Sequence, residues 1–213
     1  MSQQSAQKSV MGKWAFKNWY PVYSPTVFNE VLVGEAPAEE ASKLVNRTIG
    51  VTLFDITKDL SHLTIKLTFQ IDRVEGDKAF TRFKEMELAR DYIRSLVRRG
   101  SSKVMVIQDV TTSDGAVLRF EVLAVTTYRC STSRKRGIRA AISSKLSEVT
   151  ANADFATLVR DAAMGKLSIS LMEAGKKIYP LRKAEVMKLK VIRYPTRPSE
   201  AKKAEITVAQ AQQ

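Results

Sequence analysis

Five cations lie within eleven residues of one another with no acidic residue among them: Arg129, Arg134, Lys135, Arg136 and Arg139. Arginine and lysine bind phosphate oxygens through charge-assisted hydrogen bonds, and arginine can make two such bonds at once. The apolar spacing that follows predicts a helix, so this cluster lies where the helix dipole is already positive and costs stability. Taken by itself, the cluster is explained equally well by a phosphate-bearing partner and by a solvated basic turn; the chain's net charge of +13 favours the phosphate-bearing partner.

Two other basic groups and one aromatic segment give weaker signals. Cations after a helix end also suit the helix dipole, so part of their signal is structural. Aromatic rings interleaved with lysines can stack on bases, but we expect at least one of the two tryptophans to anchor the core instead. The weaker candidates for RNA contact are Arg98, Arg99, Lys103, Lys188, Lys190 and, near the start, Lys13, Trp14, Lys17 and Trp19.

No set of residues predicts catalysis, a metal site or a cofactor. The only histidine, His62, follows Ser61, and neighbouring residues of a strand point to opposite faces, so the pair cannot form a dyad. The only cysteine, Cys130, would need a histidine as its base, and the chain has none besides His62. We expect Cys130 to be a packing residue. Glu85 and Glu87 lie two residues apart among cations, as in an ordinary salt-bridged surface. We therefore predict a protein that is not an enzyme.

Composition and net charge exclude several classes of protein and indicate the charge of the partner. The chain has 213 residues, with 35 Lys and Arg against 22 Asp and Glu, a net charge of +13. One cysteine and one histidine exclude a disulfide scaffold and a Cys/His zinc site. No apolar run approaches the roughly 20 residues of a membrane span, and no signal peptide is recognisable. The sequence predicts a cytoplasmic protein with a polyanionic partner and no membrane contact.

Several segments predict β-strands. Leu63 to Ile71 alternates apolar and polar residues, and residues 44–56 form a β-rich run broken by Gly50. Residues 104–110 and 117–125 form two more runs, joined by a turn whose Asp114-Gly115 pair suits a tight hairpin. Residues 178–192 alternate again and predict a late strand that rejoins the first sheet.

Other segments predict helices. Arg82 to Arg99 fits an amphipathic helix, ended by Gly100, and apolar residues repeat at helical spacing over 138–149 and 155–162. A third short helix is expected over 168–175. Strands interrupted by helices predict an α+β fold, built as a partly closed β-barrel body with flanking helices and an extended N-terminal arm.

The expected organisation is a single barrel domain over residues 11–194, with a helical insertion around 134–175. The first ten residues carry little apolar surface and predict a disordered tail. Residues 195–213 are likewise polar or small and predict a mobile C-terminal tail.

Six ordered fragments resemble one family: KNWYPVYSPTVF, LVNRTIGVTLFDIT, FKEMELARDYIRSLVRR, DVTTSDGAVLRFEVLAVT, SRKRGIRAAI and IYPLRKAEVMKLKVI. They resemble the S-three-A-e family of small-subunit ribosomal proteins, which archaea and eukaryotes share. The resemblance covers residues 11–194. Relative to eukaryotic members of the family, the chain is short at its C-terminal end and poor in Cys and His, which indicates an archaeal member.

The resemblance implies a β-barrel body on the platform of the small ribosomal subunit, near the mRNA exit. Its implied partners are small-subunit rRNA, neighbouring platform proteins and mRNA near the exit channel. The fragment SRKRGIRAAI makes Arg134, Lys135, Arg136 and Arg139 the leading rRNA contacts. Two alternatives remain: a free single-strand RNA-binding barrel or RNA chaperone, and, more distantly, an RNA-processing enzyme that would need an acid/base or Mg²⁺ site.

Overall fold

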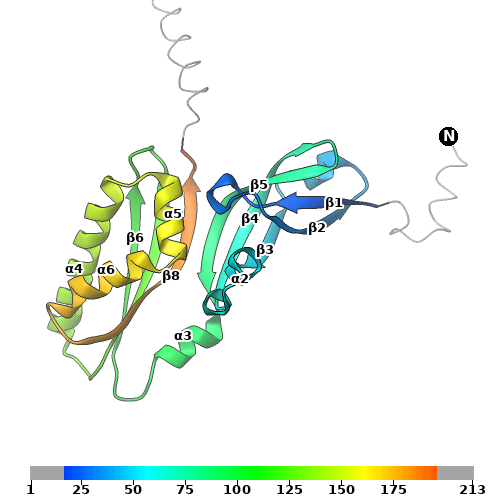
Figure 1. The fold of residues 1–213 in the computed structure, drawn as a ribbon. Coiled ribbons are helices and arrows are strands. Elements are labelled where there is room, and N and C mark those ends of the chain that lie inside the picture. Colours follow the sequence, from blue (N-terminus) through cyan, green and yellow to red (C-terminus); the bar gives the residue numbers. More distant parts are fainter. Residues whose placement is uncertain (1–16, 196–213) are drawn as a thin grey trace, which may run out of the picture. The chain divides into compact units, whose positions relative to one another are not determined.

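The computed structural model describes residues 17–195, which form two compact units (Figure 1). The first unit runs to Lys84 and the second begins at Glu85, so the division falls inside strand β5 (Lys78–Leu88). Lys13, Trp14 and nearly all of the two predicted tails lie outside the described residues. The prediction of one domain over residues 11–194 stays a prediction.

The first unit is built mainly from β-strands, which pair in the order β2-β1-β5-β4-β3. Strands β1 and β2 are antiparallel, whereas β1 runs parallel to β5 where Val22 lies opposite Ala79. Its elements before β5 are β1 (Asn18–Tyr23), η1 (Thr26–Phe28), β2 (Leu32–Ala38), η2 (Ala41–Leu44), β3 (Thr48–Thr52), α2 (Leu53–Thr57), η3 (Leu60–His62) and β4 (Ile65–Glu75).

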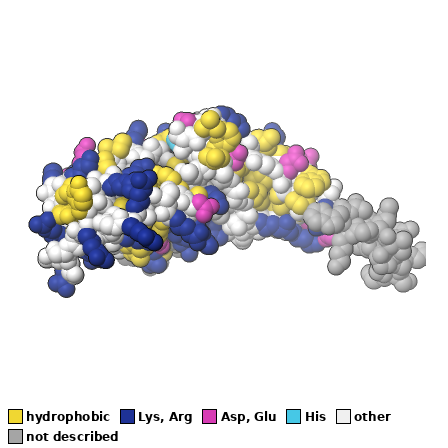
Figure 2. Space-filling model, turned by 90° about the horizontal axis from the view of Figure 1, so that it is seen from below, with side chains coloured by type: hydrophobic (Ala, Val, Ile, Leu, Met, Phe, Trp, Pro, Cys, Tyr) yellow, Lys and Arg dark blue, Asp and Glu magenta, His cyan; other side chains and the backbone are white. Residues whose placement is uncertain are grey.

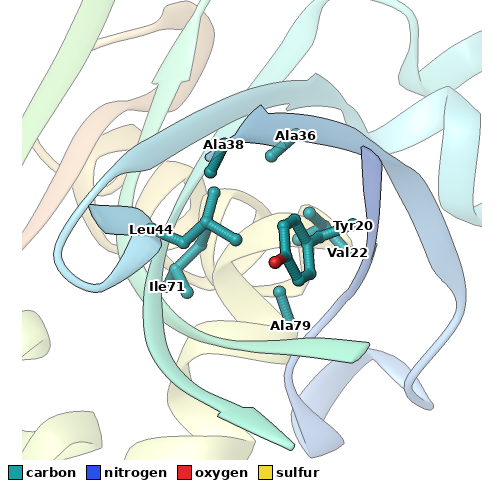
Figure 3. Close-up of a cluster of buried hydrophobic side chains, with 7 residues drawn as sticks. All are labelled: Tyr20, Val22, Ala36, Ala38, Leu44, Ile71 and Ala79. Carbon is teal, nitrogen blue, oxygen red and sulfur yellow. The ribbon is translucent and has the colours of Figure 1, made fainter. Parts of the chain in front are cut away.

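Buried side chains from four elements and from the start of β5 form a core in this unit. Figure 3 shows them pointing toward a common centre while the strands curve around them. Alternate residues of β1 contribute, because successive side chains of a strand point to opposite faces. The members are Tyr20, Val22, Ala36, Ala38, Leu44, Ile71 and Ala79.

The second unit is a four-stranded sheet with helices. Its strands pair in the order β5-β8-β7-β6, and each of these pairs is antiparallel. Its elements after β5 are α3 (Arg90–Leu96), β6 (Lys103–Thr111), β7 (Val117–Thr126), α4 (Thr132–Ala151), α5 (Phe155–Ala163), α6 (Lys166–Lys176) and β8 (Leu181–Arg193).

Helices α4, α5 and α6 lie together against one face of this sheet (Figure 1). Ile138, Ile142 and Leu146 repeat every four residues along α4 and are fully buried, so one face of the helix packs inward. Polar contacts fix α4 on β6, since Ser143 donates a 2.7 Å hydrogen bond to Gln108, which in turn donates to Ser147 at 2.8 Å. The predicted helices over 138–149, 155–162 and 168–175 are confirmed.

The predicted hairpin is also confirmed, because β6 and β7 pair from Lys103 opposite Val125 to Thr111 opposite Val117. Gly115 has a φ of 74°, the left-handed conformation that the turn requires. The late strand β8 pairs with β7 along its length and with the last residues of β5.

The helix predicted over Arg82 to Arg99 is wrong in its first half. Residues up to Leu88 belong to β5, and only Arg90–Leu96 is helical. Burial along β5 alternates at Ala79, Thr81 and Phe83 and resumes at Met86 and Leu88. Between Phe83 and Met86 the alternation of buried and half-buried positions is shifted by one residue. The two buried side chains are therefore three residues apart, a spacing that imitates a helical repeat.

The strand predicted over residues 44–56 is correct only for its middle, Thr48–Thr52. Leu44 ends a short 3-10 helix, and residues from Leu53 onward form α2. The turn into α2 is held by Asp55, whose carboxylate accepts hydrogen bonds from the Thr52 N–H at 3.0 Å and hydroxyl at 2.7 Å. These bonds keep the pKa of Asp55 below its usual value and favour helix initiation over a longer strand.

The mixed α and β architecture with flanking helices is confirmed, but the partly closed barrel is not. Among residues 17–195 the strand order has free ends at β2, β3 and β6 and does not close on itself. Alternation along a strand records which face is buried, whereas closure depends on which distant edges pair. The described part of the predicted N-terminal arm is strand β1, paired on both sides.

Replacing Gly175 with Ala should destabilise the second unit. A Cβ at this helical position would overlap the Leu181 side chain, which is buried at 5% exposure, and would lie 3.9 Å from Ile138. Overpacking costs about 1–3 kcal/mol, from which a helix-propensity gain of about 0.5–1 kcal/mol is subtracted. Urea unfolding of Gly175→Ala would measure this loss.

Gly50→Ala is the matched control, since nothing lies within 4 Å of its added Cβ. It should change the free energy of unfolding by no more than about 0.5 kcal/mol. Equal stability of the two variants would show that Leu181 moves aside at little cost.

Candidate nucleic-acid interface

Three segments that lie far apart in the sequence meet at one end of the second unit. They are residues 98–103, 128–139 and 176–182, and together they contain eleven Lys and Arg and no Asp or Glu. We call this surface the basic end. Figure 2, seen from below, shows many Lys and Arg side chains and few acidic ones on the face in view. The eleven cations are Arg98, Arg99, Lys103, Arg129, Arg134, Lys135, Arg136, Arg139, Lys176, Lys177 and Arg182.

Ser102 joins the first of these segments to the second. Its N–H donates a 2.9 Å hydrogen bond to the Thr126 hydroxyl, and its carbonyl accepts from the Thr126 N–H at 3.0 Å. The Cys130 N–H donates to the Ser102 hydroxyl at 3.3 Å. Both Ser102 and Thr126 are buried, so these bonds hold the loop of Arg98 and Arg99 beside the start of α4.

Tyr179 joins the third segment to the second. Its hydroxyl donates to the Arg129 carbonyl at 3.2 Å, and the Arg134 guanidinium lies 5.0 Å from the centre of its ring. Next to it, Ile178 fills the space beside Gly137, where a Cβ would be 3.3 Å from a side-chain methyl of Ile178. A cation over an aromatic face near the surface contributes about 0.5–1 kcal/mol, which favours this orientation of the Arg134 side chain.

The predicted cluster lies at the start of α4, as expected from the apolar spacing. Its first turn contains no acidic residue that would offset the cations there. Arg136 is exposed, Lys135 is half-buried, and Arg139 donates from Nε to the Met105 carbonyl at 3.3 Å while staying exposed. Cations are therefore gathered where the fold itself disfavours them, a state that bound phosphates would relieve.

Lys188 does not join the basic end. Its ammonium group lies 2.9 Å from Glu85 and 3.8 Å from Glu87, and its side chain is 29% exposed. The hydrogen bond to Glu85 raises the pKa of Lys188 above its usual value, against the opposing effect of burial. Lys190 is exposed but lies opposite Glu85 of β5 and Arg119 of β7, on a strand face of mixed charge.

Of the predicted aromatic segment, the structure places only Lys17 and Trp19. Trp19 is 59% exposed on β1, opposite Pro37 of β2, so it is not the core anchor. Tyr20, its neighbour, points inward instead. Both residues belong to the first unit, whose described part carries no excess charge.

The two units differ sharply in charge. Residues 17–84 contain nine Lys and Arg and nine Asp and Glu, a difference of zero. Residues 85–195 contain 21 Lys and Arg and 11 Asp and Glu, a difference of +10. The described part of the second unit therefore carries ten of the chain's thirteen net positive charges.

The residues considered for catalysis take part in ordinary contacts. The His62 Nδ1 lies 2.9 Å from the Thr57 hydroxyl, and Glu85 and Glu87 bind Lys188. Over residues 17–195, no group of three or more His, Cys, Asp or Glu is placed to hold a metal ion. Within the same range, no helix is long and apolar enough to cross a membrane.

Sequence reasoning missed the residues that assemble the basic end. Ser102 and Thr126 carry no recognisable signal, because their roles depend on pairing across 24 residues. Tyr128 and Tyr179 were missed as well, although an aromatic residue directly before Arg129 is a signal that could have been noticed. Lys176, Lys177 and Arg182 lie about 40 residues after the cluster in the sequence, and only the fold brings their segment beside α4.

Fold and charge together define a mixed α/β protein with two units, of which the first is neutral over its described residues and the second is strongly basic. The family model described as the Ribosomal S3Ae family matches residues 5–195. The chain belongs to this family, in agreement with the resemblance of its six fragments.

Similar proteins come from archaea and share the name small ribosomal subunit protein eS1. The one from Pyrobaculum neutrophilum is 54% identical over 182 residues, which are 85% of this chain and 82% of the relative. The one from Pyrobaculum calidifontis is 51% identical over 194 residues, 91% of this chain and 87% of the relative. The one from Sulfurisphaera tokodaii is 46% identical over 191 residues, 90% and 99% of the two chains.

Thr126→Val should destabilise the second unit by about 1–3 kcal/mol, because it leaves the buried Ser102 N–H without its acceptor. Chemical denaturation would measure the loss, and hydrogen exchange at the Ser102 amide should accelerate. Thr48→Val, at an exposed position of β3, is the control and should change little. An unchanged Ser102 amide in Thr126→Val would mean that the hydroxyl does not fix this loop.

Asp109 should titrate below the usual aspartate range, because Arg119 donates hydrogen bonds of 2.7 Å and 2.8 Å that lower its pKa. A lowered pKa in the folded state contributes stability above the ordinary aspartate pKa, and this stability is lost as the pH falls through the lowered value. Carboxyl NMR titration should show the Asp109 pKa rising in Arg119→Gln. An Asp109 pKa that is identical in the two proteins would contradict this pairing in solution.

Proposed function

We propose that this protein is a structural component of the small ribosomal subunit and that its basic end binds rRNA. The family and the names of its archaeal relatives support the first part. The observation that carries the second part is the convergence of three segments with eleven cations and no acid. The proposed role is binding without turnover, in the cytoplasm.

The basic end supplies what an RNA backbone requires. Phosphate neutralisation releases condensed counterions, so affinity depends on the number of cations that reach the backbone. Arg134 and Arg139 are held in place by Tyr179 and Met105, which lowers the entropy lost when they bind phosphate. Neighbouring exposed cations need no such support to contribute charge.

The finer parts of the proposal follow from the resemblance. We place the protein on the platform near the mRNA exit, in contact with neighbouring ribosomal proteins and with mRNA near the exit channel. The neutral first unit, with the exposed Trp19, is suited to a protein neighbour better than to a polyanion.

Charge reversal of Arg134, Lys135, Arg136 and Arg139 to Glu should weaken binding to small-subunit rRNA. The dependence of log affinity on log salt should flatten by about 0.7–0.9 for each phosphate that the protein no longer neutralises. Filter binding or calorimetry over a range of salt concentrations would measure both changes.

The control carries the same change in net charge on the neutral unit, through Lys43, Lys58, Lys66 and Lys78 to Glu. It should keep the salt slope of the native protein, because the slope counts neutralised phosphates rather than net charge. Equal slopes for the two quadruple variants would remove this cluster from the interface.

Sedimentation of a native lysate tests the ribosomal part independently. The protein should follow the small subunit in fixed stoichiometry and resist a high-salt wash. A protein that stays at the top of the gradient, and that binds short unstructured RNA with quenching of its tryptophans, would instead be a free single-strand RNA-binding protein.

A further inference from the structure

Tyr128 stands out at the basic end because a large aromatic ring is left 67% exposed there. It lies in the short segment between β7 and α4, directly before Arg129. The other aromatic residue of this surface, Tyr179, already has the Arg134 guanidinium over its ring. Among residues 17–195, no cation and no other aromatic ring lies against Tyr128, so its faces are available to a ligand.

The main chain around Tyr128 is held from both sides. Its own carbonyl accepts a 2.7 Å hydrogen bond from the Thr126 hydroxyl, and the next carbonyl, that of Arg129, accepts from Tyr179. The Thr127 N–H donates to the Pro180 carbonyl at 3.1 Å. This exposed ring is thus carried by a fixed backbone rather than by a loose loop.

A ring on a fixed backbone costs little to immobilise. A tyrosine side chain has only two rotatable angles, so most of its contact energy remains after the entropy of ordering is subtracted. Arg129 is the next residue in the chain, and Tyr179, whose hydroxyl binds the Arg129 carbonyl, carries the Arg134 guanidinium over its own ring. Bound RNA would therefore be held by its phosphates while one of its bases reaches the ring.

We propose that Tyr128 is a stacking platform for an unpaired base of the RNA held at the basic end. This inference rests on the proposed rRNA binding and adds the kind of RNA feature that is recognised. Proteins read unpaired nucleotides largely by stacking them on aromatic rings, whereas a continuous helix offers no free base face. The site selects a bulge, a loop or a strand end in preference to a uniform duplex.

The cations favour RNA over a protein partner. Cationic residues surround the aromatic stacking sites of proteins that bind single-stranded nucleic acids. The segment around Tyr128 carries Arg129 on one side and no acid up to Arg139. A protein neighbour that covered this ring would have to desolvate several cations in a segment that holds no carboxylate to balance them.

Tyr128→Leu and Tyr128→Phe, compared on full-length small-subunit rRNA, test the proposal. Loss of the ring in Tyr128→Leu should lower affinity by about 5- to 150-fold, the range for removal of one stacked base. The salt slope should not change, because the cations that neutralise phosphates are all still present. Tyr128→Phe should bind as the native protein does, since stacking requires the ring and not the hydroxyl.

Two further measurements sharpen the test. Ultraviolet crosslinking should join Tyr128 to one nucleotide, and an abasic nucleotide at that place should abolish the difference between the native protein and Tyr128→Leu. Ile107→Ala, which removes an apolar side chain of similar exposure (62%) from β6, is the control and should leave affinity unchanged.

The outcomes separate this proposal from the one on which it rests. If Tyr128→Leu binds rRNA normally while charge reversal at α4 weakens binding, stacking is overturned and rRNA binding stands. If Tyr128→Leu binds rRNA normally but fails to enter the subunit, the ring contacts a protein and the proposal is also overturned. If charge reversal has no effect either, both proposals are overturned.

Discussion

The double pairing of β7 is the constraint on which the second unit depends. β7 is bonded to β6 along one edge and to β8 along the other, so it brings a strand near the middle of the chain against one near its end. Its inward side chains, including Leu118 and Phe120, are fully buried. Because β7 cannot shift without breaking both ladders, the segment that follows it has a fixed starting point. Tyr128, Arg129 and the first turn of α4 are positioned by that segment.

The arrangement of charge at the basic end lowers the stability of the fold. Cations at the start of α4 oppose the helix dipole and repel one another. The fold compensates in part, with Arg134 over Tyr179 and Arg139 on a main-chain carbonyl, but it supplies no carboxylate in the first turn of α4. Elsewhere the same unit neutralises its cations, as Lys188 between Glu85 and Glu87 shows. This contrast is the physical basis of the proposed rRNA contact at α4.

The division of charge between the units has a consequence for association. A polyanion is attracted by the field of the second unit, whereas the described part of the first unit offers a balanced surface. This holds whatever the relative placement of the two units. The exposed Trp19 then lies on a surface with no net attraction for RNA, and its apolar area is better suited to a protein contact.

Features that depend on near neighbours in the chain could be predicted from the amino acids alone. The Asp114-Gly115 pair between two alternating runs was enough to predict the hairpin, and the four-residue spacing of apolar side chains was enough to predict α4. Composition alone predicts a polyanionic partner.

Long-range pairing settled the rest. It makes Phe83 to Leu88 a strand, because pairing with β8 outweighs a local spacing that imitates a helix. It also determines that Lys188 is neutralised by β5 while the cations of three distant segments gather at α4. Hydrogen bonds such as that from Ser102 to Thr126 join residues far apart in the chain, and no local pattern encodes which distant segments will meet.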